Sequence, residues 1–197
     1  MNASESAIQV GPALRTDGAA LRELFERNDI RCHCRYWHFT GDKNAWLERC
    51  AANPEENARE LVQALETQDG PEGVVARQGE RIVAWMKLTS AARVNKLYDQ
   101  RLYKNLPCFA EDRSRVFTIG CFFVDPGYRR QGLTRRLVAA GVELSRSAGA
   151  AAVEAFPRRA ELLADEELWT GPFSAFRQEG FEIVHDFAPY PVLRRTL

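Results

Sequence analysis

Hydrophobic residues in the first third of the chain recur mainly at helical spacing. A short strand-like stretch at 8–14 is followed by apolar residues of 21–25 that share one helix face, and a second short helix is expected at 46–50. The strongest pattern begins at 53–54, where a capping asparagine and a proline suited to a first helical turn precede apolar residues spaced along 58–65. We therefore expect a front part made largely of helices.

The pattern changes to short apolar runs after the DGPEG cluster at 69–73. The run at 74–89 contains Gln-Gly-Glu between two Val/Ile-rich halves, which predicts a β-hairpin. Residues 90–114 leave two structures open, a helix or a mobile crossover. The run VFTIGCFFV at 116–124 is apolar on both faces, as expected of a central strand that is covered on both sides.

A helix and a further strand follow this central strand. Apolar residues from Leu133 to Leu144 mark one side of a helix that ends near 147–149, and AAVEAFP at 151–157 predicts another short strand. Strand, glycine-containing turn, helix and strand form a βαβ unit.

The turn that enters this helix, DPGYRRQGLTRR, places four arginines around one glycine: Arg129, Arg130, Arg135 and Arg136 flank Gly132. The first N–H groups of a helix lack intrahelical partners and lie at the positive end of its dipole, so they favour an anion. A glycine there lets a bulky anion approach closely. The alternative is an amphipathic helix with a solvated basic face. The spacing is neither that of a nucleotide-binding P-loop nor that of a dinucleotide fold.

Overall composition makes any anion site local. The 197 residues carry 27 basic and 27 acidic side chains, so the chain as a whole has no charge that would recruit nucleic acid or an anionic membrane. The N-terminal residues MNASESAIQV do not resemble a secretory signal and no apolar run is long enough to cross a bilayer, so we expect a cytoplasmic protein. Five irregularly spaced cysteines favour reduced thiols over a disulfide framework.

The glycine turn resembles the coenzyme A pyrophosphate loop of the GNAT superfamily of N-acyltransferases. That pattern is Arg or Gln, two residues, Gly, one residue, then Gly or Ala, and it falls here on Arg129, Gly132 and Thr134. The strand before the loop, the helix and strand after it, and a later helix leaving through Gly180-Phe181 follow the family's order. The resemblance covers residues 74–197 well and 8–28 loosely.

The resemblance implies a fold of the α/β (α+β) class, with a mixed, mostly antiparallel central sheet that is splayed between strands 4 and 5 and flanked by helices. It implies a single domain over 1–197, with a helical acceptor-side insertion at 29–68 and a coenzyme A-binding core at 115–186. The implied activity is transfer of an acetyl group from acetyl-CoA to a primary amine, without a metal. The alternative is a catalytically silent acyl-CoA-binding or regulatory module.

The same resemblance assigns binding roles to backbone groups. N–H groups of the strand end before the loop are expected to hold the pantetheine arm and polarise the acyl carbonyl, and amides at the helix start are expected to hold the pyrophosphate. The residues implied at the strand are Phe122, Phe123 and Val124, and those at the loop are Arg129, Arg130, Gln131, Gly132, Leu133 and Thr134.

The sequence identifies a general acid and a general base less clearly than the binding residues. The family often has a tyrosine, acting as general acid, at the position held here by Phe176, and an asparagine where this chain has Trp169. Release of the thiolate would then rely on water, Ser174 or Tyr190. Glu154, a lone carboxylate in the strand AAVEAFP, is the candidate base, with pairing to an arginine or a turn to solvent as the alternative.

The stretch Cys32-His33-Cys34-Arg35-Tyr36-Trp37-His38-Phe39 is the other conspicuous feature. Its thiols and imidazoles lack the paired spacing of a structural zinc site, so we expect no metal there. Lining of the acceptor pocket and plain core packing both stay open. The acceptor is expected to be a small-molecule or peptide amine of unidentified structure, nucleic acid and membrane are not expected as partners, and a homodimer stays open.

Overall fold

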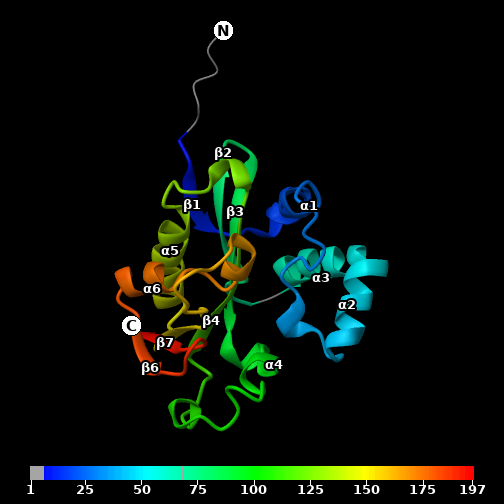
Figure 1. Ribbon diagram of the computed structural model, residues 1–197. Coiled ribbons are helices and arrows are strands. Elements are labelled where there is room, and N and C mark those ends of the chain that lie inside the picture. The colour runs from blue at the N-terminus through cyan, green and yellow to red at the C-terminus, as the bar shows by residue number, and fades with distance from the viewer. Residues whose placement is uncertain (1–6, 68) are drawn as a thin grey trace.

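A computed structural model describes residues 7–67 and 69–197 as a seven-stranded sheet with helices on both faces (Figure 1). The strand order is β1-β2-β3-β4-β5-β7-β6. The strands are β1 (Gln9–Pro12), β2 (Gly73–Gln78), β3 (Arg81–Ser90), β4 (Val116–Val124), β5 (Ala152–Ala155), β6 (Glu182–His185) and β7 (Val192–Thr196).

Strands β4 and β5 form the one parallel pair between described strands, and all other neighbours are antiparallel. The parallel register runs from Val116 opposite Ala152 to Ile119 opposite Ala155, where β5 ends. Strand β4 continues to Val124, paired only with β3. The second half of β4 therefore has one edge without a strand beside it.

The helices divide between the two faces. Helices α5 and α6 lie on one side of the sheet, and α1, α2 and α3 lie on the other (Figure 1). Short α4 lies in the segment between β3 and β4. The helix bounds are α1 (Gly18–Glu26), α2 (Lys43–Ala52), α3 (Pro54–Thr67), α4 (Asn95–Tyr98), α5 (Leu133–Ser147) and α6 (Phe173–Gln178).

Alternation of side chains along β3 joins the sheet to both layers. Met86 points into the cluster under α5, whereas its neighbour Trp85 points into the cluster under α1 and α3. Both are fully buried, as is Phe25 of α1, whose ring meets that of Trp85 at 6.4 Å. Because the two faces are both covered, most side chains of β3 and of the start of β4 are apolar, and Lys87, Thr89 and Thr118 are buried among them.

The predicted hairpin, the helix after Asn53, the central strand and the helix after the glycine turn are all confirmed, the last ending at Ser147 as expected. The predicted fold class is confirmed, with the parallel pair at β4 and β5. Within 90–114, the helix is only the single turn α4; Leu97 and Tyr98 are nevertheless buried, so this crossover packs on the sheet.

One strand was missing from the sequence prediction. Strand β7 inserts between β5 and β6, although its sequence VLRRT has only two apolar residues. Its arginines have partners inside the fold: Arg194 pairs with Glu154, and Arg195 donates to the carbonyl of Glu179. Among the described helices, none is long and apolar enough to span a bilayer.

Candidate active site

The glycine turn leaves β4 at Asp125 and enters α5 at Leu133. Gly132 is the N-terminal cap of α5 and has a φ of 71°, in the left-handed region that glycine adopts without strain. A β-carbon built on Gly132 would meet no protein atom within 4 Å. The backbone conformation and the open space beside it, rather than packing, therefore account for the glycine.

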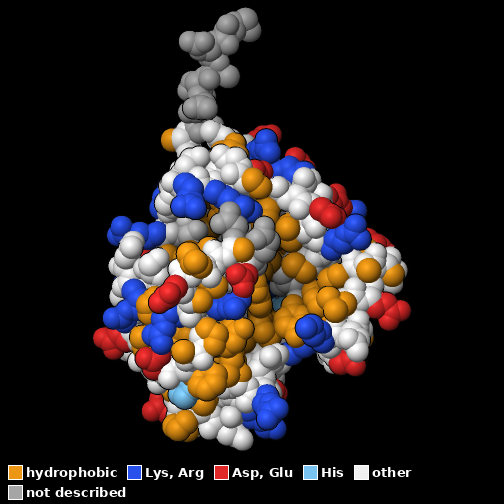
Figure 2. Space-filling view, in the orientation of Figure 1, with side chains coloured by type: hydrophobic (Ala, Val, Ile, Leu, Met, Phe, Trp, Pro, Cys, Tyr) orange, Lys and Arg blue, Asp and Glu red, His pale blue; other side chains and the backbone are white. Residues whose placement is uncertain are grey.

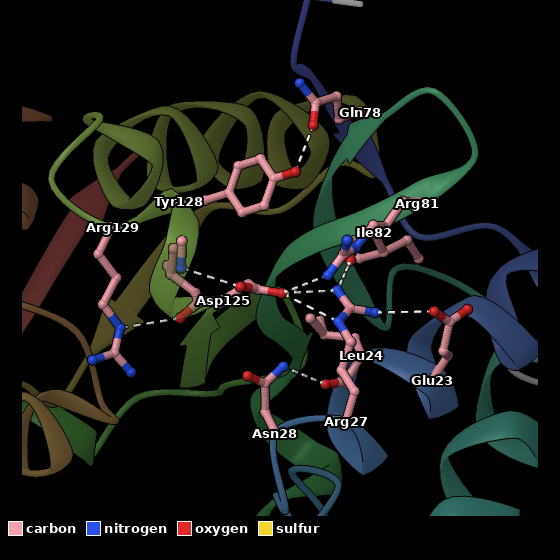
Figure 3. A network of polar contacts seen from close by, with 12 residues as sticks. Glu23, Leu24, Arg27, Asn28, Gln78, Arg81, Ile82, Asp125, Tyr128 and Arg129 are labelled. Atoms are coloured by element: carbon pink, nitrogen blue, oxygen red, sulfur yellow. Dashed lines mark hydrogen bonds and ion pairs between the residues drawn. The ribbon is translucent and has the colours of Figure 1, made fainter. Parts of the chain in front are cut away.

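Asp125 anchors the start of this turn (Figure 3). Its Oδ1 accepts the N–H of Gly127 at 3.2 Å, and its Oδ2 accepts Nε and Nη2 of Arg27 at 3.1 Å each, with Arg81 Nη2 at 3.3 Å. Burial acts to raise the pKa of Asp125, but the Gly127 N–H and the Arg27 guanidinium outweigh it, so its pKa lies below the usual value. The loop is thus tied to α1 and β3 by an ionised carboxylate.

The four arginines around Gly132 have different surroundings. Arg135 forms an ion pair with Glu179 at 2.6 Å, and Arg136 donates to the carbonyl of Ile8 at 2.7 Å. Arg129 donates from Nε to the carbonyl of Val124 at 3.2 Å, and Arg130 has a φ of 61°. The first backbone bond of α5 runs from Arg136 N–H to Gly132 C=O. The amides before it therefore open toward the loop.

A cavity of about 760 Å³ connects this loop with the unpaired edge of β4. The hollow lies between the part with α1–α3 and the part with α6, and hydrophobic side chains gather along it (Figure 2). Among the residues predicted for cosubstrate binding, those that line it are Phe122, Phe123, Val124, Arg129, Arg130, Gly132, Leu133 and Thr134. The structure therefore brings the predicted strand end and the predicted loop to one space.

The β4 edge is not open along its whole length. The N–H of Phe122 donates to the carbonyl of Trp169 at 2.6 Å, and the indole N–H of Trp37 donates to the carbonyl of Gly120 at 3.2 Å. The two tryptophan rings stack with centroids 5.9 Å apart. The N–H of Phe122, one of the strand groups expected to hold the pantetheine arm, is therefore already bonded to the segment before α6, and its role in binding stays a prediction.

Besides Glu154, three residues predicted for the site lie away from the cavity wall. Phe176 is fully buried and its ring packs against Phe122 and Phe181, so it belongs to the core. Gln131 donates to the carbonyl of Gly127. Tyr190 lies between β6 and β7 with its side chain partly exposed, whereas Ser174 does line the cavity. Of the two hydroxyl groups considered as acids, only that of Ser174 has the required position.

Glu154 is fully buried on β5, with both oxygens occupied. Its Oε1 accepts Nε and Nη2 of Arg194 at 3.0 and 2.5 Å, and its Oε2 accepts the hydroxyl of Tyr98 at 2.5 Å. Burial and then the charge of Glu154 raise the pKa of Tyr98 well above its usual value, so this phenol stays a donor. These contacts match the alternative interpretation, a carboxylate paired with arginine, and Glu154 as base stays a prediction.

The aromatic stretch of 32–39 packs partly in the core and partly at the edge of β4, and its lining of an acceptor pocket stays a prediction. Cys34 is part of the core under α1 and α3, whereas Trp37 reaches the β4 edge. His38 is half-buried, and its desolvation together with nearby cations lowers its pKa to about 2, so its imidazole is neutral. Within the described part of the chain, no three His, Cys, Asp or Glu side chains are arranged to hold a metal ion.

Sequence reasoning did not identify two groups at the site. Arg27 lies 98 residues from Asp125 along the chain, and no local pattern connects the two. Cys32, Cys34 and Cys121 also line the cavity together, although no sequence pattern connects Cys121 with the other two. Their proximity follows from the packing of the loop after α1 against β4.

Comparison with solved structures shows the fold. The aminoglycoside acetyltransferase AAC(6')-Ib in complex with ribostamycin and coenzyme A is similar with a TM-score of 0.59 and 15% identity, over 97% of this chain and 94% of that one. The PaiA N-acetyltransferase of Thermoplasma acidophilum in complex with coenzyme A has a TM-score of 0.56 and 9% identity, over 97% and 99%. A GNAT acetyltransferase of Streptococcus pneumoniae gives 0.56 and 13%, over 97% and 99%.

Sequence comparison gives the family. No curated protein sequence matches this chain significantly. The sequence profile of the acetyltransferase (GNAT) family matches residues 36–164, which is more than half of the chain and includes β4, the glycine turn and α5. By this match and by its fold, the chain belongs to the GNAT family of acetyltransferases.

Proposed function

We propose that this protein transfers the acetyl group of acetyl-CoA to a primary amine of an acceptor. The observation that carries the proposal is the single cavity that joins the glycine turn at the start of α5 to the free edge of β4. At the start of α5, the cavity offers helix amides to a diphosphate. At the edge of β4, it offers strand amides to the extended pantetheine arm. Complexes of related folds with coenzyme A support the choice of cosubstrate.

The loop would bind the diphosphate mainly through its backbone. The amides from Arg130 to Thr134 precede the first helical bond of α5, and Gly132 leaves open space above them. Arg129 and Arg130 line the same cavity and add positive charge. Thr134 contributes a hydroxyl where the family pattern has glycine or alanine, and we propose that it donates to a phosphate oxygen.

The acyl end of the cosubstrate would lie along Phe122–Val124. To use the N–H of Phe122, the pantetheine arm must replace the carbonyl of Trp169, which holds that N–H at 2.6 Å. Replacing one carbonyl by another conserves the number of hydrogen bonds, so the exchange costs mainly the ordering of the displaced segment. An N–H directed at the thioester carbonyl then stabilises the oxyanion formed when the amine attacks.

Proton transfers in this site rely on water. Glu154 does not line the cavity, and its charge is already neutralised by Arg194, so we propose that water removes the proton of the ammonium substrate. A thiol with a pKa near 8.5 is a tolerable leaving group at neutral pH even without a tyrosine. Of the two hydroxyl groups considered from the sequence as acids, that of Ser174 belongs to a residue that lines the cavity.

The acceptor would enter on the side of 29–68. The loop after α1 places Trp37 beside Gly120 of β4, and the rings of Tyr36 and Trp46 continue from it at 4.7 and 5.5 Å. This wall is aromatic and suits the apolar part of a small-molecule amine. The ribostamycin complex of the related fold supports a small-molecule acceptor of this kind.

Thermal denaturation with acetyl-CoA tests the binding half of the proposal. A ligand at a hundredfold excess over its dissociation constant stabilises the native state by roughly 2.7 kcal/mol, which should raise Tm by about 5–10 °C. Gly132→Glu should abolish the shift, because it adds bulk and negative charge at the loop. Gly149→Glu is a matched control: Gly149 also has a positive φ and open space, but at the other end of α5. Equal shifts in both variants would refute the assignment of the loop.

Release of free coenzyme A over a panel of amines, amino acids, aminoglycosides and peptides tests the catalytic half. An active amine gives stoichiometric coenzyme A and acetylated product. Tight binding of acetyl-CoA with no turnover on any amine would instead favour a silent acyl-CoA-binding module, for which Phe176 in place of a tyrosine is the specific observation.

A further inference from the structure

Three thiols meet on the acceptor side of the cavity. The Sγ atoms of Cys34 and Cys121 are 2.6 Å apart, although 87 positions separate the two residues in the chain. Cys32, two residues before Cys34 in the same turn, lies close enough to interact with it. Cys34 and Cys121 are buried, Cys32 is the more exposed member, and all three line the same cavity as the glycine turn. No step of the proposed acetyl transfer uses them.

The backbone around Cys34 is held in an unfavourable conformation. His33 and Cys34 have φ angles of 42° and 55°, a left-handed region in which non-glycine residues cost of order 1–3 kcal/mol each. This turn directs the Cys34 side chain at β4, where Cys121 pairs across the sheet with Lys87. A strained turn that brings two thiols into contact indicates a use for the contact.

We propose that Cys34 and Cys121 are a redox-active dithiol that a small-molecule disulfide oxidises to an intramolecular disulfide, with Cys32 as the thiol that meets the oxidant. A disulfide bond is about 2.05 Å long, so the two sulfurs need to move by only about 0.5 Å. The oxidant reaches Cys32 through the cavity, because Cys32 is the least buried of the three.

The exchange balances in three steps. The thiolate of Cys32 attacks the small disulfide RSSR, forming a mixed disulfide and releasing one RSH. Cys34 then attacks the sulfur of Cys32 and releases the second RSH, and Cys121 attacks the sulfur of Cys34, returning Cys32 as a thiol. The two protein thiols lose two hydrogens and two electrons, and RSSR gains them.

The surroundings make this pair slow to react. The hydrogen bond to Cys34 and burial raise the pKa of Cys32, and burial raises the pKa of Cys34, so little thiolate is present at neutral pH. The pair therefore responds to a sustained change of the thiol-disulfide ratio and not to a brief oxidant pulse.

The bond would join the loop after α1 to the strand that carries Phe122. This loop also carries Trp37, which covers Gly120. Oxidation would therefore fix the aromatic wall against the β4 edge. The claim that the dithiol shares a cavity with acetyl-CoA rests on the proposed function. Formation of the disulfide itself does not depend on that function.

Peptide mapping of oxidised protein tests the proposal. The starting protein is a Cys50→Ser/Cys108→Ser variant, which removes the two cysteines outside the cavity. After incubation with oxidised glutathione, free thiols are alkylated and the protein is digested with trypsin without reduction. We expect a link between the peptides 32–35 and 116–129. Alkylated Cys121 after complete incubation would overturn the proposal.

Single variants assign the link, because trypsin leaves Cys32 and Cys34 on one peptide. The link should persist in Cys32→Ser, formed at least tenfold more slowly, and should be lost in Cys34→Ser. A link that survives Cys34→Ser overturns the assignment, and an unchanged rate in Cys32→Ser overturns the role of Cys32. Circular dichroism before oxidation confirms that each variant is folded.

Stability and ligand protection give independent readouts. A bond that closes an 87-residue loop should raise Tm by roughly 10 °C, reversed by dithiothreitol. An unchanged Tm in protein whose link is mapped would show that the bond does not constrain the fold as proposed. Acetyl-CoA should slow oxidation by covering the cavity; disulfide formation at an unchanged rate, with the link mapped as expected, would count against the proposed cosubstrate site and not against the dithiol.

Discussion

Replacing Asp125 by asparagine tests how the glycine turn is held. Asp125 directly follows β4, and its carboxylate receives two donors from Arg27, one from Arg81 and the amide of Gly127 (Figure 3). Asparagine keeps one oxygen for Gly127 but presents an NH2 group to the guanidinium of Arg27. Two donors then face each other, and Arg27 loses its less exposed carboxylate partner and keeps the exposed Glu23 at 3.6 Å.

The magnitude follows from how far these charges are from water. Breaking a fully buried pair costs 3–5 kcal/mol, and an exposed pair contributes 0.2–1 kcal/mol. The side chain of Asp125 is 12% exposed and that of Arg27 is 20% exposed, whereas that of Arg81 is 51% exposed and adds little. We therefore expect Asp125→Asn to lower the free energy of unfolding by about 2 kcal/mol and Tm by about 4–8 °C.

Urea denaturation of both proteins at several pH values checks the cause. The pKa of Asp125 lies below its usual value in the folded state, so its ionised form contributes stability above the unfolded pKa of about 3.9, and that contribution is lost as pH falls through the folded pKa. The difference between the two proteins should be constant from pH 7 to pH 5 and shrink below about pH 4. Asp112→Asn, at an exposed carboxylate bonded to Ser114, is the control and should leave Tm nearly unchanged.

The reasoning fails if Asp125→Asn lowers Tm by less than about 1 °C at pH 7, or if its effect is the same at pH 7 and at pH 3.5. A further consequence separates loop position from bulk stability. Acetyl-CoA should bind the folded variant several-fold more weakly, because the turn before Gly132 is less fixed. Unchanged affinity in calorimetry would show that α5 holds the loop without Asp125.

Three other predictions follow from the site. Trp169→Ala removes the ring that stacks on Trp37 and loosens the carbonyl on Phe122, so acetyl-CoA should bind two- to tenfold more tightly in calorimetry; weaker binding would mean that the ring contacts the cosubstrate. Glu154→Gln should destabilise the fold by about 2 kcal/mol in urea but keep kcat/KM within tenfold, and a hundredfold loss in folded protein would identify a base. Tyr190→Phe should leave the pH profile of kcat/KM a single rising limb within threefold of the parent; loss of a falling limb would identify Tyr190 as the acid.

The glycine turn and β4 could be predicted because their conformations depend on residues close together in the sequence. A left-handed glycine at a helix start, an apolar strand before it and a helical period after it are all readable within about thirty residues. The resemblance then supplied the order of the remaining elements. Gly132 and β4 were therefore placed correctly without any knowledge of distant contacts.

The partners of these elements could not be read in the same way. Whether the N–H of Phe122 is free depends on a segment 47 residues later, and whether Glu154 is available depends on Arg194 in a strand with too few apolar residues to be recognised. Each is a long-range polar contact, and sequence periodicity carries no information on which polar groups meet. These two features of the site could therefore not be read from the sequence alone.

The arginines around Gly132 show why a cluster of charge is a poor guide to its use. Arg135 and Arg136 neutralise Glu179 and tie down the carbonyl of Ile8, so half of the cluster holds α5 to α6 and to the chain before β1. What distinguishes the loop is the pair of left-handed residues, Arg130 and Gly132, that turn successive amides toward one cavity. In the proposed function, a chain with no net charge would thus build its anion site from backbone dipoles, and side-chain charge would serve first to keep those dipoles in place.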